Sequence, residues 1–210
     1  MPKLNPSKLK KLRLFCFDVD GVFTPGNMAY GEQGDELKFF HFYDGMALEL
    51  LRIAGFLQKK PCIIIVITSE KIKLVERRFR KLKVNEIHLG AMHKTEVIEQ
   101  LQKKYGVSQQ ETFVMGDDVQ DIPMLARAGF RVVPPNAPAS MMELVKKKKL
   151  VDYIPQRKGG EGAVREVIDL FLKSIGLFDS VLAAKIDSKQ KAAFRTWQEQ
   201  HYQTEVQYHD

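Results

Sequence analysis

Two segments of the chain, residues 12–17 and 62–68, are apolar at nearly every position. A strand that is apolar on both faces is typical of a parallel sheet covered by helices on its two sides. Shorter apolar runs predict four further strands, at residues 86–89, 112–115, 130–133 and 151–154.

Helical patterns fall between these strands. In residues 72–82, apolar side chains recur every three or four positions and basic side chains occupy the opposite face. We also predict helices at 44–54, where Asp44 would be the N-cap, and at 95–105, 122–128 and 162–174. The alternation of strands and helices predicts an α/β doubly wound, Rossmann-like fold, which binds ligands at the carboxyl ends of its parallel strands.

One segment interrupts this alternation. Residues 28–30, a polar turn at 31–34 and an apolar arm at 37–42 predict a β-hairpin inserted after the first strand. The arm is more apolar than an isolated hairpin requires, so we expect it to pack against another surface.

The length of 210 residues and an apolar content of 44% fit one globular domain, which we place at residues 10–176. Residues 177–210 are read as a helix-prone C-terminal extension in which Phe194 and Trp197 are the main anchors. The end after Gln198 is a candidate for disorder.

The composition of the chain indicates in which cellular compartment the protein is expected. No apolar run approaches the roughly 20 residues needed to cross a bilayer, and residues 1–13 have no apolar core of a secretion signal. Cys16 and Cys62 stand alone, which favours buried reduced thiols over a zinc site. We therefore expect a cytoplasmic protein with no membrane partner.

The formal net charge of +7 raises the possibility of nucleic-acid binding. However, 26 acidic residues are interspersed and no stretch alternates basic with aromatic residues, so we expect no nucleic-acid partner. A solvated basic surface, or a basic surface that attracts a small anionic substrate, fits better.

The sharpest chemical signal is the pair Asp18 and Asp20, followed by Gly21, at the end of the first predicted strand. Carboxylates two positions apart can face one spot there, and they tolerate each other best around a cation. Hard oxygen ligands favour Mg²⁺. An acidic turn after a strand is also common without any metal.

Other strand ends supply complementary groups. Asp117, Asp118 and Asp121 follow another apolar run and would complete an acidic cup. Thr68 ends the Ile-rich strand, and Lys94 stands at the start of a helix, where a cation suits an anionic ligand better than it suits the helix. Together these groups predict an active site for phosphoryl chemistry.

This ordered set resembles the haloacid dehalogenase superfamily of aspartate-nucleophile phosphotransferases, over about residues 10–176. More narrowly, four segments resemble the capless phosphatases of acidic sugar phosphates, which act on 3-deoxy-D-manno-octulosonate 8-phosphate or on nine-carbon ulosonate 9-phosphates of the sialic-acid type. These segments are DVDGVFT (18–24), FYDG (42–45), GDDVQD (116–121) and GGEGAVRE (159–166).

The resemblance implies a role for each residue. Asp18 would be the nucleophile that forms an aspartyl-phosphate, and Asp20 the general acid and base. Mg²⁺ would be held by Asp18, the carbonyl of Asp20 and Asp117. Asp118 and Asp121 would orient Lys94 or metal-bound waters. Contacts to the substrate would come from Thr68, Ser69, Glu70, Lys71, Lys94, Gly160, Glu161 and Arg165.

Spacing leaves no room for a cap domain, since only 47 residues separate Asp20 from Thr68 and 25 separate Thr68 from Lys94. The active site would be open to water. The resembled subfamily solves this problem as a homotetramer with shared active sites, in which the hairpins assemble centrally, and the apolar arm 37–42 suits that role.

Two other functions remain in view: a phospho-receiver signalling module and a non-catalytic basic binding protein on the same fold. A receiver carries its phosphoacceptor later in the chain, and the complete acidic set argues against a dead fold. The substrate is less determined, because Ser69-Glu70-Lys71 stands where octulosonate phosphatases usually have Gly-Arg. This departure favours a nine-carbon ulosonate 9-phosphate.

Overall fold

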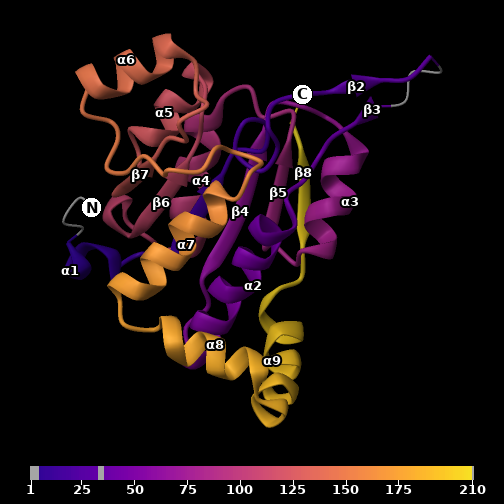
Figure 1. Cartoon of the computed structure of the whole chain (residues 1–210), viewed down its shortest axis with the longest axis vertical. Helices are drawn as coiled ribbons and strands as arrows, with labels where there is room; N and C mark the ends of the chain where they lie inside the picture. Colours follow the sequence, from indigo (N-terminus) through magenta and orange to yellow (C-terminus); the bar gives the residue numbers. More distant parts are fainter. Residues whose placement is uncertain (1–4, 33–35, 210) are drawn as a thin grey trace.

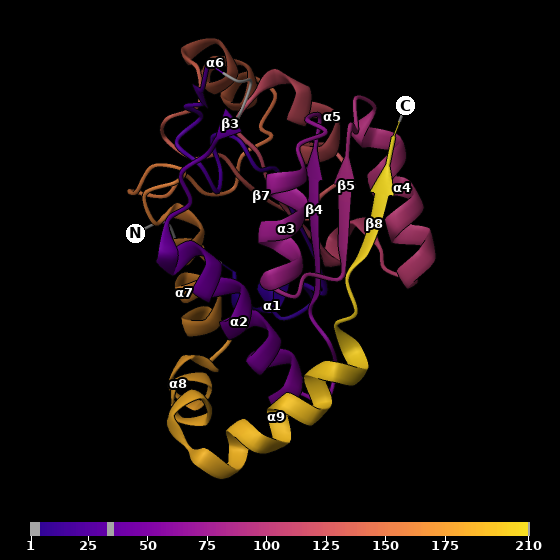
Figure 2. The ribbon, with the colours of Figure 1, turned by 90° about the vertical axis from the view of Figure 1, so that its right-hand side faces the viewer.

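A computed structural model describes residues 5–32 and 36–209. Its centre is a six-stranded sheet in which every pairing is parallel, in the order β7-β6-β1-β4-β5-β8 (Figures 1 and 2). The predicted α/β doubly wound fold is therefore confirmed. The strands are β1 (Leu14–Phe17), β4 (Ile63–Thr68), β5 (Glu86–Leu89), β6 (Thr112–Met115), β7 (Phe130–Val132) and β8 (Glu205–Tyr208).

Helices cover both faces of this sheet, and Figure 2 shows α4 on the face opposite to α2 and α3. Successive side chains of β1 explain why both faces are apolar: Phe15 and Phe17 enter one buried cluster, and Leu14 and Cys16 enter the other. The helices are α1 (Pro6–Leu9), α2 (Phe42–Leu57), α3 (Lys73–Lys81), α4 (Lys94–Tyr105), α5 (Ile122–Leu125), α6 (Ala139–Lys147), α7 (Ala163–Ser174), α8 (Phe178–Ile186) and α9 (Ser188–His201).

The predicted hairpin is present but shorter than expected. It consists of β2 (Ala29–Tyr30) and β3 (Glu36–Leu37), which pair with each other and project from the body of the molecule (Figure 1). Residues 33–35 of the predicted turn lie outside the described residues. The chain leaves the strand after Leu37, and no cap domain is found within the described residues.

Asp44 is not the N-cap that the sequence suggested. Helix α2 begins one turn earlier, with His41 at the N-cap position, so Asp44 lies inside the first turn. Its carboxylate instead accepts hydrogen bonds from the amides of Gly162 (3.1 Å) and Arg165 (2.8 Å). Asp44 therefore caps α7, a helix that begins 119 residues later and whose own N-cap, Gly162, has no side chain.

The strand predicted at 151–154 is reduced to a single bridge between Val132 and Tyr153. The side chain of Asp152 explains the difference, because its Oδ2 accepts from the backbone N of Arg131 (2.9 Å) and from Arg131 Nε (2.7 Å). A side chain thus takes a backbone donor that a regular ladder would use.

Residues 199–209 are ordered, contrary to the expectation for residues after Gln198. Helix α9 runs to His201, and β8 then pairs with β5 from Glu86↔Glu205 to Leu89↔Tyr208. Between them, buried Tyr202 donates from its hydroxyl to the carbonyl of Cys62 (2.8 Å). The C-terminal segment therefore forms one edge of the main sheet.

Two expectations from composition can be compared with the structure. Both cysteines are buried free thiols, and burial raises the pKa of Cys62 to about 12 and that of Cys16 further. Among the residues described, no helix combines the length and apolarity needed to span a bilayer.

Candidate active site

The predicted catalytic side chains converge on one pocket at the carboxyl ends of the central strands. Asp18 follows β1, Thr68 ends β4, and Asp117 follows β6 by two residues. The pocket has a volume of about 230 Å³ and is lined by Asp18, Asp20, Gly21, Gly26, Thr68, Ser69, Glu70, Lys94, Asp117, Asp118, Gln120 and Asp121. Parallel pairing of β1 with both β4 and β6 brings these distant residues to one edge.

Lys94 is the cation at the base of this pocket and is only 4% exposed. Its Nζ donates to Oδ1 of Asp18 and to Oδ1 of Asp121, each at 2.7 Å. Burial alone would lower the pKa of Lys94, but the two carboxylates outweigh it and raise the pKa above its usual value. These ion pairs also offset the unfavourable position of a cation in the first turn of α4.

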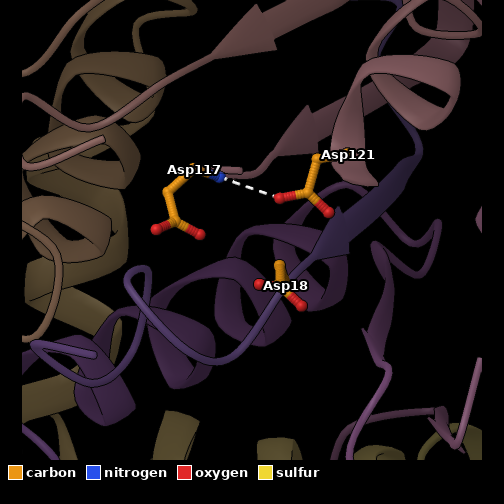
Figure 3. Close-up of side chains that lie close together, drawn as sticks. All are labelled: Asp18, Asp117 and Asp121. Carbon is orange, nitrogen blue, oxygen red and sulfur yellow. Dashed lines mark hydrogen bonds between the residues drawn. The ribbon is translucent and has the colours of Figure 1, made fainter. Parts of the chain in front are cut away.

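Three carboxylates gather beside Lys94. Oxygen atoms of Asp18, Asp117 and Asp121 lie within 4.8 Å of one another (Figure 3). Burial, followed by repulsion from neighbouring carboxylates, raises the pKa of Asp18 to about 7 and that of Asp117 to about 8. A divalent cation would relieve this crowding, and a set of carboxylate oxygens fits the preference of Mg²⁺.

Asp121 differs from the other two because both of its oxygens already accept hydrogen bonds. Oδ1 accepts from Lys94, and Oδ2 accepts from the amides of Asp117 (2.9 Å) and Asp118 (3.2 Å), the first of which is dashed in Figure 3. Asp118 accepts from the amide of Val119 (2.6 Å) and caps the short 3₁₀ turn that carries Asp121. Asp121 is thus held in place to orient Lys94 and the loop after β6.

Asp20 has two partners of its own. Thr24 Oγ1 donates to Oδ1 of Asp20 (2.9 Å), and Lys38 Nζ donates to Oδ2 (2.5 Å). The side chain of Lys38 is 1% exposed, and no sequence motif marked it as a site residue. Its one signal was a single cation in the apolar stretch between Leu37 and Phe39.

The glycine-rich segment 159–162 packs directly on the turn after Asp20. A Cβ on Gly159 would lie 1.7 Å from the carbonyl oxygen of Gly21, and a Cβ on Gly21 would lie 1.8 Å from Oδ2 of Asp117. Asn136 joins the two loops, because it donates to the carbonyl of Gly21 (2.9 Å) and accepts from the amide of Gly159 (2.7 Å). Only glycines permit this approach of two backbones beside the carboxylates.

The predicted substrate contacts divide into two groups. Thr68, Ser69, Glu70 and Lys94 line the pocket, and the Thr68 hydroxyl accepts from the amide of Glu70 (3.2 Å). The other four residues lie outside the pocket of a single chain. Lys71 is exposed and its stem lies over Gly90, Gly160 packs on Pro25, Glu161 is exposed, and Arg165 pairs with Asp169 (2.8 Å) beside a separate cavity of about 700 Å³.

Comparisons with known sequences agree with this geometry. A family model described as haloacid dehalogenase-like hydrolase matches residues 57–150. The 3-deoxy-D-manno-octulosonate 8-phosphate phosphatase KdsC of Haemophilus influenzae is 30% identical over 169 residues, which cover 80% of this chain and 87% of the relative. KdsC of Escherichia coli is 30% identical over 180 residues, which cover 86% of this chain and 89% of the relative.

Solved structures show the same architecture. The 3-deoxy-D-manno-octulosonate 8-phosphate phosphatase of Moraxella catarrhalis, in complex with magnesium ion, phosphate ion and KDO, superimposes with a TM-score of 0.75 at 33% identity, covering 85% of this chain and 95% of that one. The cobalt-bound phosphatase of Haemophilus influenzae gives 0.72 at 28% identity, covering 89% and 99%. The acidic pocket, the capless fold and these relatives show that the chain belongs to the haloacid dehalogenase-like hydrolases.

Proposed function

We propose that this hydrolase is a Mg²⁺-dependent phosphatase that cleaves the phosphomonoester of an acidic sugar through an aspartyl-phosphate intermediate. The observation that carries the proposal is the buried Lys94, which bridges Asp18 and Asp121 in the pocket that also contains Asp20 and Asp117. This arrangement presents one carboxylate to an incoming phosphate and surrounds it with the charges that phosphoryl transfer requires.

Asp18 would act as the nucleophile. Its carboxylate oxygen forms a bond to phosphorus while the bond from phosphorus to the sugar oxygen breaks, and Asp20 gives its proton to that leaving oxygen. In the second step, Asp20 takes a proton from a water molecule. The oxygen of that water forms a bond to phosphorus while the bond from phosphorus to the Asp18 oxygen breaks, which releases inorganic phosphate and restores the Asp18 carboxylate. Thr24 and Lys38 hold the Asp20 carboxylate in place for both transfers.

Asp18, Asp117 and the backbone carbonyl of Asp20 are the groups that would hold Mg²⁺. The ion would neutralise the negative charge shared by the nucleophile and the phosphate, which is what metal ions supply in phosphoryl transfer. Thr68 and Lys94 would hold the phosphoryl oxygens. Asp121 and Asp118 position Lys94 and the loop after β6 without contacting the substrate.

The substrate we propose is a phosphorylated ulosonate. Glu70 lines the pocket mouth, where its carboxylate could accept hydrogen bonds from the hydroxyl-rich arm of a nine-carbon ulosonate 9-phosphate. The relatives found by comparison bear the name of the eight-carbon substrate, 3-deoxy-D-manno-octulosonate 8-phosphate. The nine-carbon ulosonate 9-phosphate and the eight-carbon compound should therefore both be assayed as substrates.

The active form we propose is a homotetramer with shared active sites. Large apolar side chains are exposed on the hairpin and on the start of α2, including Tyr30 (71%), Phe39 (67%) and Phe42 (69%). An exposed aromatic surface of this kind is typical of a protein interface. Closure by a neighbouring subunit would also exclude water from a pocket that has no cap of its own.

The function is tested by phosphate release from a panel of phosphorylated eight- and nine-carbon ulosonates in the presence of Mg²⁺. We expect the wild type to hydrolyse at least one of them and Asp18→Asn to lose activity by a factor of roughly 10³ or more, because a neutral amide does not attack phosphorus. Asp179→Asn, which changes an exposed carboxylate on α8, is the matched control and should remain active. Normal turnover by Asp18→Asn would refute the mechanism.

A further inference from the structure

A cavity distinct from the acidic pocket and from the one beside Arg165 is lined by residues of α2, α8 and α9 and by residues at the end of α3. Helices α8 and α9 lie at the end of the molecule away from the carboxyl ends of the strands (Figures 1 and 2). Its volume is about 450 Å³. Two acidic residues, Glu49 and Glu199, line it together with six basic ones: Arg52, Lys81, Lys83, Lys185, Lys191 and Arg195. The lining therefore carries an excess of four positive charges.

Arg52 is the most unusual member of this lining. It is 6% exposed, and it donates from Nε to Oε1 of Gln198 (2.8 Å) and from Nη1 to the carbonyl of Leu82 (2.5 Å). Both acceptors are neutral, and the guanidinium also lies over the ring of Tyr202, 5.7 Å from its centroid. No carboxylate lies within ion-pair distance of Arg52 in the part of the chain that the structure describes. Burial lowers the pKa of Arg52 to about 10, so the side chain stays charged at neutral pH. A buried cation is normally paired with an anion.

The other basic side chains of the cavity also lack enough carboxylate partners. Glu49 is already neutralised by an ion pair with Lys185. Within residues 5–32 and 36–209, none of the side chains of Lys81, Lys83, Lys191 and Arg195 forms an ion pair with a carboxylate. Because like charges around one cavity repel each other, a negatively charged occupant would be favoured there.

The shape of the cavity adds a preference for a small molecule. Ile53, Ala184 and Phe194 contribute apolar surface beside the cations, and Phe194 is itself buried. A volume of this size is within the range of small-molecule sites, whereas nucleic acids and membranes are bound on open basic surfaces. Nε and Nη1 of Arg52 are already engaged, so its guanidinium would offer positive charge and the donors of Nη2 to a phosphate or carboxylate group.

From the buried unpaired Arg52 and the surrounding cations, we propose that this cavity is a binding site for a small polyanion that carries clustered phosphate or carboxylate groups. An apolar or ring-shaped portion of the ligand would contact Phe194. The site is separate from the acidic pocket, and its occupation does not depend on the phosphatase activity proposed above.

Isothermal titration calorimetry on the full chain in EDTA tests this site with three probes: pyrophosphate, ATP and citrate. Trp197, the one tryptophan of the chain, stacks beside Phe194 with ring centroids 6.4 Å apart, so its fluorescence supplies a second readout. We expect pyrophosphate or citrate to bind in a manner that weakens as NaCl is added. Selective binding of the two phosphate compounds would identify a phosphate ligand, and selective binding of citrate a carboxylate ligand.

Variants separate this site from the acidic pocket. The double change Lys191→Gln and Arg195→Gln should raise the Kd of the bound probe at least tenfold. The matched control, Lys147→Gln with Lys148→Gln, removes the same charge from exposed positions at the end of α6 and should leave the Kd within twofold. Asp18→Asn should bind the probe as the wild type does. Absence of binding by all three probes at 10 mM, or equal affinity of the cavity variant, would overturn the proposal.

Discussion

The contact between Asp44 and α7 gives a prediction that can be worked out from the structure. In Asp44→Ala, the amides of Gly162 and Arg165 lose the carboxylate that accepts their hydrogen bonds. Asp44 is 1% exposed, so water replaces this acceptor poorly. Helix α7 would also lose the negative charge at its positive end.

Loss of an N-cap costs about 0.5–2 kcal/mol, and an unsatisfied buried donor costs about 1–3 kcal/mol. Burial of the Asp44 carboxylate offsets part of the stability that these hydrogen bonds contribute. Burial raises the pKa of Asp44, and this effect exceeds the opposite effects of the two amides and of His41. We therefore expect Asp44→Ala to reduce the free energy of unfolding by about 2 kcal/mol, in the middle of these ranges. For a chain of this length, that change lowers the Tm by about 4–8 °C.

Urea unfolding followed by circular dichroism measures this change. Asp179→Ala is the matched control, because Asp179 lies in the first turn of α8 and is exposed, so it should cost only about 0.5 kcal/mol. Asp44→Asn keeps one neutral acceptor and should lie between the two. A loss below about 0.5 kcal/mol in Asp44→Ala would show that Asp44 does not hold α7.

Two further predictions concern the metal and the assembly. In EDTA, the raised pKa values of Asp18 (about 7) and Asp117 (about 8) mean that the folded state binds more protons than the unfolded state above pH 4. The free energy of unfolding should therefore fall as the pH rises from about 4 to about 8. Differential scanning fluorimetry should show that Mg²⁺ raises the Tm more at pH 8 than at pH 5. An equal rise in Tm at the two pH values would contradict this prediction. Phe39→Glu with Phe42→Glu should reduce the mass seen by sedimentation and raise the KM, whereas a fully active wild-type monomer would exclude shared active sites.

The sequence alone predicted five of the six strands of the central sheet, all except β8, and the carboxylates at its edge. The runs at β1 and β4 are apolar at successive positions, and such segments are stable only when helices cover both faces of a parallel sheet. Once the strands are parallel, Asp18 and Thr68 must emerge at the same edge, as must Asp117 after β6. Local pattern and chain direction were therefore enough to predict most of the acidic pocket.

The strand β8 depended on tertiary structure. Its sequence, Glu-Val-Gln-Tyr, alternates polar and apolar residues over only four positions and is mostly exposed, and so short a pattern does not identify a strand. The segment becomes a strand because the edge of β5 offers unpaired backbone groups, and because buried Tyr202 fixes the chain just before it. Such pairing is decided by the partner strand.

The partners of the functional side chains were also decided by the folded chain. Lys38 reaches Asp20 from 18 residues away, and Asp44 reaches the amide of Gly162 across 118 residues. In each case a polar side chain pairs with a charge or a hydrogen-bond donor of a segment that is distant in the sequence. Sequence periodicity reports which face of an element is apolar, whereas the partner of a buried polar group is set by the packing of distant segments.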